Sequence, residues 1–277
     1  MKSLSLGYSP CPNDTFIFYA LVHEKIAAGD LRFREILEDV ETLNQMALRA
    51  ELDVTKISFH AFGHLRDKYC LLRAGAALGQ GCGPLLVSKK YRALPELRGK
   101  KIAVPGRLTT AFLLLRLVEP LLKENVLVMP FNLIMEAVRN GEADAGLIIH
   151  ESRFTYPEAG LHKVMDLGEW WETETGLPIP LGAIIAKRDL GGAVIRQTEA
   201  AIRTSLEYAF AHPAEPKKYI SRHSQELGED TIEQHISLYV NDYSLDIGSE
   251  GLRAVEELFR LAEEKGILPK SSISVCD

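Results

Sequence analysis

The chain has 277 residues, 46% of them hydrophobic and 25% charged, and its 32 lysines and arginines against 38 aspartates and glutamates leave a formal charge of −6. This is the composition of an ordinary globular protein, and it excludes collagen-like, coiled-coil and disordered chains. An acidic excess without a run of five like charges gives no electrostatic basis for binding a polyanion, so nucleic acid is not an expected partner. The length favours one large α/β domain or two lobes.

The chain has no stretch of about 18 apolar residues, the length that a membrane span requires, so no span is expected. The first residues are too few and too polar for the apolar core of a signal peptide, and we therefore expect a cytoplasmic protein. The cysteines at positions 11, 70, 82 and 276 have neither the spacing of a metal knuckle nor that of a disulfide framework. We expect four reduced thiols.

Short β-rich runs alternate with runs of helical period, a pattern typical of βα units and mostly parallel sheets. Strands are expected at residues 4–9, 31–37, 53–59 and 84–88. Asn13 or Asp14 is expected to cap a buried helix that ends near residue 25, and Asp39 to cap a second helix. Glycines between residues 75 and 83 then mark a passage out of the first lobe.

The same alternation starts again near residue 99. Strands are expected at residues 101–104, 126–129, 145–149 and 180–186, helices at 109–119 and 133–140, and amphipathic helices after residue 190. This order predicts two α/β lobes, a larger one of residues 1–88 plus 185–277 and an inserted one of residues 89–184. Each lobe is expected to hold a mostly parallel sheet flanked by helices, with a ligand cleft between the lobes at the carboxyl ends of the strands.

Polar residues follow the first and third predicted strands. The loop after the first strand offers a hydroxyl, an amide and a carboxylate from Ser9, Asn13 and Asp14, which either contact a ligand or only stiffen the turn and cap the helix. The third strand ends in the segment TKIS at residues 55–58. Its N–H groups and hydroxyls either meet a ligand or begin the next helix, with Ser58 as the cap.

Two hydroxyl side chains, Thr109 and Thr110, stand at a predicted helix start behind Gly106. The first N–H groups of a helix have no intrahelical acceptor and carry the positive end of the helix dipole. Such a position is suited to bind a carboxylate or a phosphate. Ordinary capping explains one threonine without requiring both, so we expect an anion site here.

The segment AGLIIHESRFTY at residues 145–156 carries the strongest chemical signal. Its apolar residues drive a strand through the core and deliver His150 where the sheet ends, followed by Glu151 and Arg153. An imidazole with an ordinary pKa near ~6.5 is the side chain best suited to take up a proton at physiological pH. His150 is therefore a candidate general base, against the alternative of a hydrogen-bonded core histidine.

Rival sites are weaker. His60 and His64 have the i,i+4 spacing of two zinc ligands, but no glutamate follows His60 and no third ligand is suitably spaced, so no metal site is expected. Trp170 and Trp171 are either packing residues or an apolar wall for an aromatic ligand, and packing is favoured. The chain has no GxSxG, P-loop or GxGxxG motif.

Two sets of motifs indicate relationships. LRGKKIAVPG, the TTA that follows it, and NGEADAGLII resemble second-lobe signatures of the periplasmic-binding-protein-like fold of type II. A fuller set runs along nearly the whole chain: LGYSPCPNDTFIFYAL (6–21), LEDVETLN (37–44), VTKISF (54–59), AVPGRLTTAF (103–112), AGLIIHESRFTYP (145–157), DLGEWWE (166–172) and GLPIPLGAI (176–184). Together these resemble the 1,4-dihydroxy-6-naphthoate synthases, a family of the futalosine route to menaquinone.

This resemblance implies a cofactor-free carbon–carbon lyase that takes cyclic dehypoxanthine futalosine and releases 1,4-dihydroxy-6-naphthoate plus a sugar-derived fragment. It implies that His150 is the general base. It implies that the substrate is bound by Thr55, Lys56, Ile57, Ser58, Thr109, Thr110 and Ala111. The electron-rich intermediate needs a hydrogen-bond donor, for which Lys56, Ser58 and Arg153 are candidates. The expected partner is a small aromatic carboxylate, and a homodimer stays open as the assembly.

Two main alternatives remain, and a transcriptional effector domain is a remote third, because no DNA-binding module fits in 277 residues beside two lobes. One is a solute-binding protein that carries a small carboxylate and performs no reaction, against which the missing export signal argues. The other is the sister enzyme class of the same route, a chorismate-dehydratase-type enzyme on the same fold, against which the HESRFTY segment argues.

Overall fold

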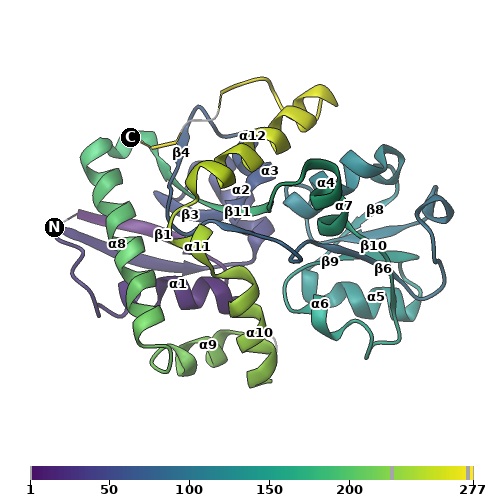
Figure 1. Ribbon diagram of the computed structural model, residues 1–277, viewed down its shortest axis with the longest axis horizontal. Helices are drawn as coiled ribbons and strands as arrows, with labels where there is room; N and C mark the ends of the chain where they lie inside the picture. Colours follow the sequence, from purple (N-terminus) through teal and green to yellow (C-terminus); the bar gives the residue numbers. More distant parts are fainter. Residues whose placement is uncertain (1, 225–227, 273–274, 277) are drawn as a thin grey trace.

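The computed structural model describes residues 2–224, 228–272 and 275–276. Figure 1 shows two α/β lobes side by side, with both ends of the chain in the same lobe. We call the lobe with the chain ends the first lobe and the other the second lobe. Within these residue ranges, no helix is both long and apolar enough to cross a membrane.

The first lobe is built around a six-stranded sheet. Its strands are β1 (Lys2–Tyr8), β2 (Leu31–Leu37), β3 (Val54–Ser58), β4 (Tyr69–Leu71), β5 (Ala77–Gly79) and β11 (Ile179–Lys187). Its helices are α1 (Pro12–Val22), α2 (Val40–Leu48), α3 (Phe59–Gly63), α8 (Gly192–Ala211), α9 (Lys217–His223), α10 (Glu229–Tyr239), α11 (Asp242–Leu245) and α12 (Gly248–Glu264). The strand order is β2-β1-β3-β11-β4, and β5 also pairs with β11.

The second lobe is built around a five-stranded sheet in the order β10-β6-β9-β7-β8. Its strands are β6 (Leu85–Ser88), β7 (Ile102–Val104), β8 (Val126–Val128), β9 (Ala145–Ile148) and β10 (His162–Asp166). Its helices are α4 (Thr110–Val118), α5 (Ile134–Asn140), α6 (Ser152–Thr155) and α7 (Leu167–Thr175). The two-lobed α/β architecture is therefore confirmed.

Both sheets are mixed, with more antiparallel pairing than the sequence predicts. β1 pairs in parallel with β2 and β3, and β7 with β8 and β9, as strands of successive βα units do. The antiparallel pairs all involve the strands that carry the chain between the lobes: β11 pairs with β3, β4 and β5, and β6 with β9 and β10. A strand that enters a sheet from the other lobe is not part of its βα succession, so it is free to run in the opposite direction.

The two crossing strands lie a few residues away from the expected junctions. β6 is hydrogen-bonded in the second sheet from Leu85, and β11 in the first sheet from Ile179. Each crossing strand thus belongs to the sheet that it enters. The division of the chain at residues 88/89 and 184/185 stays a prediction.

Local sequence signals explain where several helices begin and end. The Asp39 carboxylate caps α2 and accepts the amide N–H groups of Glu41 and Thr42, at 2.9 and 3.2 Å, and Gly141 closes α5 in the left-handed conformation, with φ of 81°. The predicted cap of α1 is wrong, because this helix begins at Pro12, whose fixed φ suits a first helical position. Its N-cap residue is Cys11, so Asn13 and Asp14 lie within the first turn.

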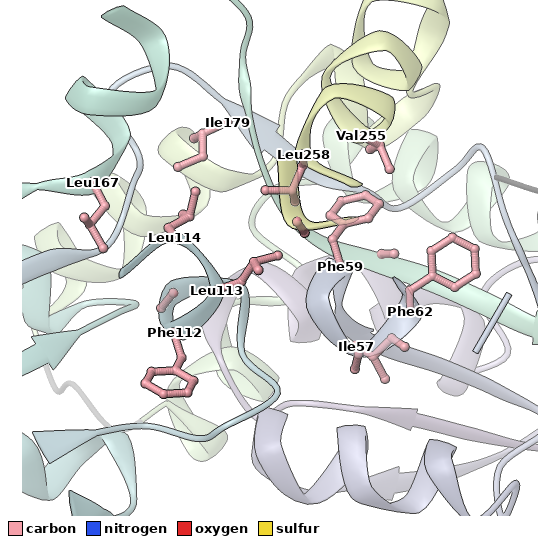
Figure 2. Packing of buried hydrophobic residues seen from close by; sticks show 14 of the residues in the cluster. Ile57, Phe59, Phe62, Phe112, Leu113, Leu114, Leu167, Ile179, Val255 and Leu258 are labelled. Carbon is pink, nitrogen blue, oxygen red and sulfur yellow. The ribbon is translucent and has the colours of Figure 1, made fainter. Parts of the chain in front are cut away.

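Apolar packing is continuous from one lobe to the other. Figure 2 shows Leu113 of α4, from the second lobe, beside Phe59 of α3 and Leu258 of α12, from the first lobe. All three side chains are fully buried. Because α4 is held by this cluster, the start of α4 has a defined position relative to the first sheet.

The prediction of four reduced thiols is wrong for two of them, since Cys70 and Cys276 form a disulfide with their Cα atoms 5.1 Å apart. The C-terminal segment returns to β4, where Val275 forms a bridge with Leu71. The amide of Cys276 donates to the carbonyl of Leu71 over 2.9 Å. A contact between residues 206 positions apart leaves no trace in the spacing of the cysteines. Cys11 and Cys82 are free and buried.

Candidate active site

A cavity lies between the two lobes. Of the residues singled out from the sequence, those that line it are Ser9, Asn13, Asp14, Lys56, Ile57, Ser58, Thr109, Thr110, Ala111 and His150. Residues that the sequence did not indicate line it as well: Val40, Leu43, Ala77, Cys82, Pro84, Ile149, Leu181, Gly182 and Tyr239.

Two predicted site residues are not part of the cavity wall. Thr55 is fully buried, and its hydroxyl donates to the backbone carbonyl of Lys56 over 3.3 Å. The guanidinium of Arg153 donates to the carbonyl of Gly83 and forms an ion pair with Asp166 over 3.0 Å. Arg153 therefore holds the backbone that leads into β6, and in this geometry it is not available as a donor to a ligand.

The Asp14 carboxylate is the centre of a buried polar network on the first-lobe wall. It accepts the hydroxyl of Ser9 over 2.7 Å and the side-chain amide of Asn13 over 2.8 Å. The ammonium of Lys56 lies 3.1 Å from it and also donates to the carbonyl of Gly75 over 2.9 Å. Both charged side chains are less than a tenth exposed, so each one neutralises a charge that would be costly to bury alone.

The start of α4 forms part of the second-lobe wall. Thr109 is its N-cap and accepts the amide of Phe112 over 3.2 Å. The hydroxyl of Thr110 donates to the carbonyl of Leu181 over 2.6 Å. Both hydroxyls therefore have partners within the protein. The donors left for an anion are the first-turn amides, such as that of Ala111, which have no intrahelical acceptor.

Glu41 of α2 crosses from the first lobe to the loop before α4. Its Oε2 accepts the amide N–H of Leu108 over 3.2 Å. The carboxylate also lies against the Cα of Gly106, where any Cβ would collide with it. Burial raises the pKa of Glu41. This contact holds the loop and the start of α4 against the first lobe.

His150 follows β9 and lies at the cavity in an unusual backbone conformation. Its φ of 56° is in the left-handed region, which is strained for a non-glycine residue and is often found at functional sites. Its ring is edge-on to Phe131, with centroids 4.9 Å apart. Burial lowers its pKa to about 4, a shift that Asp14 opposes and Lys56 reinforces. The imidazole is therefore neutral at physiological pH and can accept a proton.

A second histidine, His235 of α10, stacks on His150 with centroids 6.0 Å apart and 20° between the planes. Its Nε2 lies 2.9 Å from Oδ1 of Asn13. Because Asn13 uses its amide nitrogen to donate to Asp14, its oxygen accepts, and His235 Nε2 is the donor. His235 thus connects the polar network of the first lobe to the ring of His150, which comes from the second lobe.

The sequence carried one signal for His235 that the prediction did not use. His235 and Tyr239 are four residues apart and lie on one face of α10. Both are buried, and their rings are 4.6 Å apart at the centroids. A pair of polar rings on the inward face of an amphipathic helix was the available indication of a site.

The rival features have structural roles. His60 is buried, its Nδ1 lies 3.2 Å from the carbonyl of Thr109, and burial lowers its pKa to about 3. Trp171 is fully buried and its indole N–H donates to the carbonyl of Pro178 over 3.1 Å. The packing interpretation of Trp171 is therefore confirmed.

The chain is similar to proteins of one biosynthetic route. A family profile described as "Menaquinone biosynthesis" matches residues 4–264. A 1,4-dihydroxy-6-naphthoate synthase from Thermus thermophilus is 51% identical over 98% of this chain and 98% of its own. A second protein of that name, from Streptomyces coelicolor, is 44% identical over 96% of this chain and 95% of its own.

The fold is also that of proteins with little sequence similarity. A Candida albicans gene product, described as having the generic periplasmic binding protein fold, superposes with a TM-score of 0.70 at 14% identity, over 98% of this chain and 92% of its own. The periplasmic-binding-protein-like architecture is therefore confirmed. With residues 4–264 matched by its profile and full-length relatives above 40% identity, this chain belongs to the menaquinone biosynthesis family and is an enzyme of that route.

Proposed function

We infer that this enzyme converts cyclic dehypoxanthine futalosine into 1,4-dihydroxy-6-naphthoate, with His150 as the general base. The observation that carries the proposal is a neutral imidazole, strained in its backbone, at the wall of a cavity between two lobes. The Thermus and Streptomyces relatives, both named as 1,4-dihydroxy-6-naphthoate synthases, support this product. We propose the cytoplasm as the compartment and a homodimer as the assembly to test.

The cavity suits an aromatic carboxylate. The first-turn amides of α4 at Thr110 and Ala111 provide the positive end of a helix for the carboxylate. Val40, Leu43 and Leu181 provide apolar surface for the ring system. The position of the carboxylate at α4 would leave the remainder of the substrate to extend toward His150.

The reaction needs one proton removed, one carbon–carbon bond broken and an aromatic ring formed. A balanced course is that His150 takes the proton of a hydroxyl group on the sugar-derived fragment, the O–H electron pair forms a carbonyl on that fragment as the carbon–carbon bond breaks, and the electron pair of that bond passes into the ring system, where the charge rests on oxygen until a proton returns. Lys56 and Ser58, which line the cavity, are the candidate donors to the negative charge that develops on oxygen. Closure of the lobes would exclude water, which strengthens these interactions.

The test is turnover of the cyclic precursor by wild type, by His150→Ala and by a control variant, His212→Ala. His212 is an exposed histidine that packs on Tyr208, away from the cavity. Loss of a general base typically costs about 10²–10⁴-fold in rate, so we expect that loss in His150→Ala and wild-type rates in His212→Ala. Binding of the product should persist in His150→Ala, measured by calorimetry.

Other outcomes would assign the protein differently. Retained turnover in His150→Ala would move proton abstraction to another residue. Ligand binding without wild-type turnover would favour a carrier of a small carboxylate. Turnover of chorismate in place of the cyclic precursor would favour the sister dehydratase class.

A further inference from the structure

Three side chains with metal-binding atoms meet beside the cavity, one from the first lobe and two from the second. Cys11 precedes α1, and His150 and Glu151 follow β9. Each offers one ligand atom, and these atoms all lie within 4.8 Å of one another. Cys11 and Glu151 are each 2% exposed, so this is a buried cluster of three donor types and not a patch of surface acids.

His235 supplies an independent observation at the same place. Its Nε2 donates to Asn13, so in the neutral ring Nδ1 keeps its lone pair. Among the described residues Nδ1 has no hydrogen-bond partner, and it lies 3.7 Å from Oε2 of Glu151.

A nitrogen lone pair and a carboxylate oxygen at this separation attract a positive charge between them, which a proton or a metal cation can supply. A cation at about 2.0–2.2 Å from each atom, the usual Zn–N and Zn–O distance, spans 3.7 Å with an obtuse angle at the metal. The separation therefore has room for a cation.

The donor set favours one class of cation. A thiolate, imidazole nitrogen and a carboxylate oxygen suit a borderline-soft divalent ion such as Zn²⁺, whereas Mg²⁺ and Ca²⁺ prefer oxygen ligands. With the Cys11 proton released to solvent, Cys11 and Glu151 carry two negative charges, which match the charge of the ion. The nearby charges of Lys56 and Asp14 balance each other in their ion pair.

We propose that Cys11, His150 and Glu151 form a binding site for Zn²⁺ that joins the two lobes, beside the unpartnered Nδ1 of His235. The ion would occupy the lone pair with which His150 accepts a proton. Zinc-loaded protein is then inactive as a base catalyst, a consequence that rests on the proposed function. The binding itself does not depend on it.

The first test is a titration of Zn²⁺ into metal-stripped protein in competition with a chromophoric chelator, without reductant so that the disulfide stays intact. We expect one equivalent to bind wild type. Loss of a ligand should exceed the roughly 10–100-fold cost of a lost outer-shell partner, so Cys11→Ser should bind at least about 100-fold more weakly. Cys82→Ser is the matched control, because Cys82 is the other buried free thiol at the cavity, and its zinc affinity should equal that of wild type.

Several results would overturn the site. They are the absence of a bound equivalent in wild type, equal affinity in Cys11→Ser, or equal weakening in Cys82→Ser. If wild type binds no equivalent of zinc, a proton occupies the space between Glu151 and His235. If Cys11→Ser fails to fold, Co²⁺ added to wild type provides the answer, since a Co²⁺–thiolate bond gives an intense near-ultraviolet band and its absence contradicts the proposal.

Turnover separates this inference from the proposed function. If zinc-free wild type turns over the cyclic precursor, inhibition that follows zinc occupancy supports the blocking role, and full activity at full occupancy overturns it. If zinc-free wild type has no turnover, the proposed function fails while the measured affinity and its loss in Cys11→Ser still support the zinc site.

Discussion

On the first-lobe wall of the cavity, the polar side chains are bonded to one another before any ligand arrives, whereas on the second-lobe wall His150 and the amides at the start of α4 are left to meet one. Asp14 is saturated by donors from Ser9, Asn13 and Lys56. His150 instead has ring contacts and a strained backbone. The difference indicates that the first lobe provides a fixed electrostatic frame and that the second lobe positions the proposed general base, His150.

Breaking the first-lobe frame is expected to have the largest effect on stability. Asp14→Ala leaves the buried ammonium of Lys56 without its counter-charge, and loss of one partner of a buried pair costs about 3–5 kcal/mol in the free energy of unfolding. Urea denaturation measures this. The matched control is Glu233→Ala, which removes an exposed ion pair with Lys217 and should cost less than about 1 kcal/mol. Equal losses in both variants would contradict a rigid frame.

Removing the disulfide between Cys70 and Cys276 tests whether the stability of the first lobe can be changed without affecting the cavity. Cys276→Ser should lower the free energy of unfolding by about 2–4 kcal/mol, because it removes a constraint on a long loop of the unfolded chain. Thermal unfolding with and without reductant measures it. Reductant should lower the Tm of wild type and leave the variant unchanged, and activity per folded molecule should be the same in both. If reductant does not change the Tm of wild type, the disulfide does not stabilise the first lobe.

The pH profile sharpens the description of the second-lobe wall. Burial lowers the pKa of His150 to about 4, so the ring stays neutral as the pH falls and protonates only near that value. The acid limb of kcat/KM should therefore lie near pH 4. At pH 5.5 the rate should be about tenfold higher than with an ordinary histidine, since one pKa unit is a factor of ten. An acid limb near the ordinary histidine value would show that water reaches the ring.

What could be predicted from the sequence was local. The helix starts at Asp39 and Thr109 and the helix end at Gly141 follow from residue types that act within one turn. The βα strands follow from apolar runs. His150 at the end of β9 was also accessible, because a buried strand determines where its next residue emerges.

What was missed depends on pairings between distant segments. The short strands β4 and β5 are held by β11, more than a hundred residues further along the chain. The disulfide depends on the return of the C-terminal segment to β4. His235 reaches His150 from α10, so the stacking of the two rings exists only once the lobes are together. Neither spacing nor periodicity reports such contacts.

The carboxylate of Glu41, seated against Gly106 and bonded to the amide of Leu108, has a kinetic consequence. To admit a substrate or discharge a product through a wider mouth, the lobes must part, and this oxygen must give up its backbone donor to water. We therefore expect this side chain, remote from the proposed reacting atoms, to influence how long a ligand stays bound between the lobes.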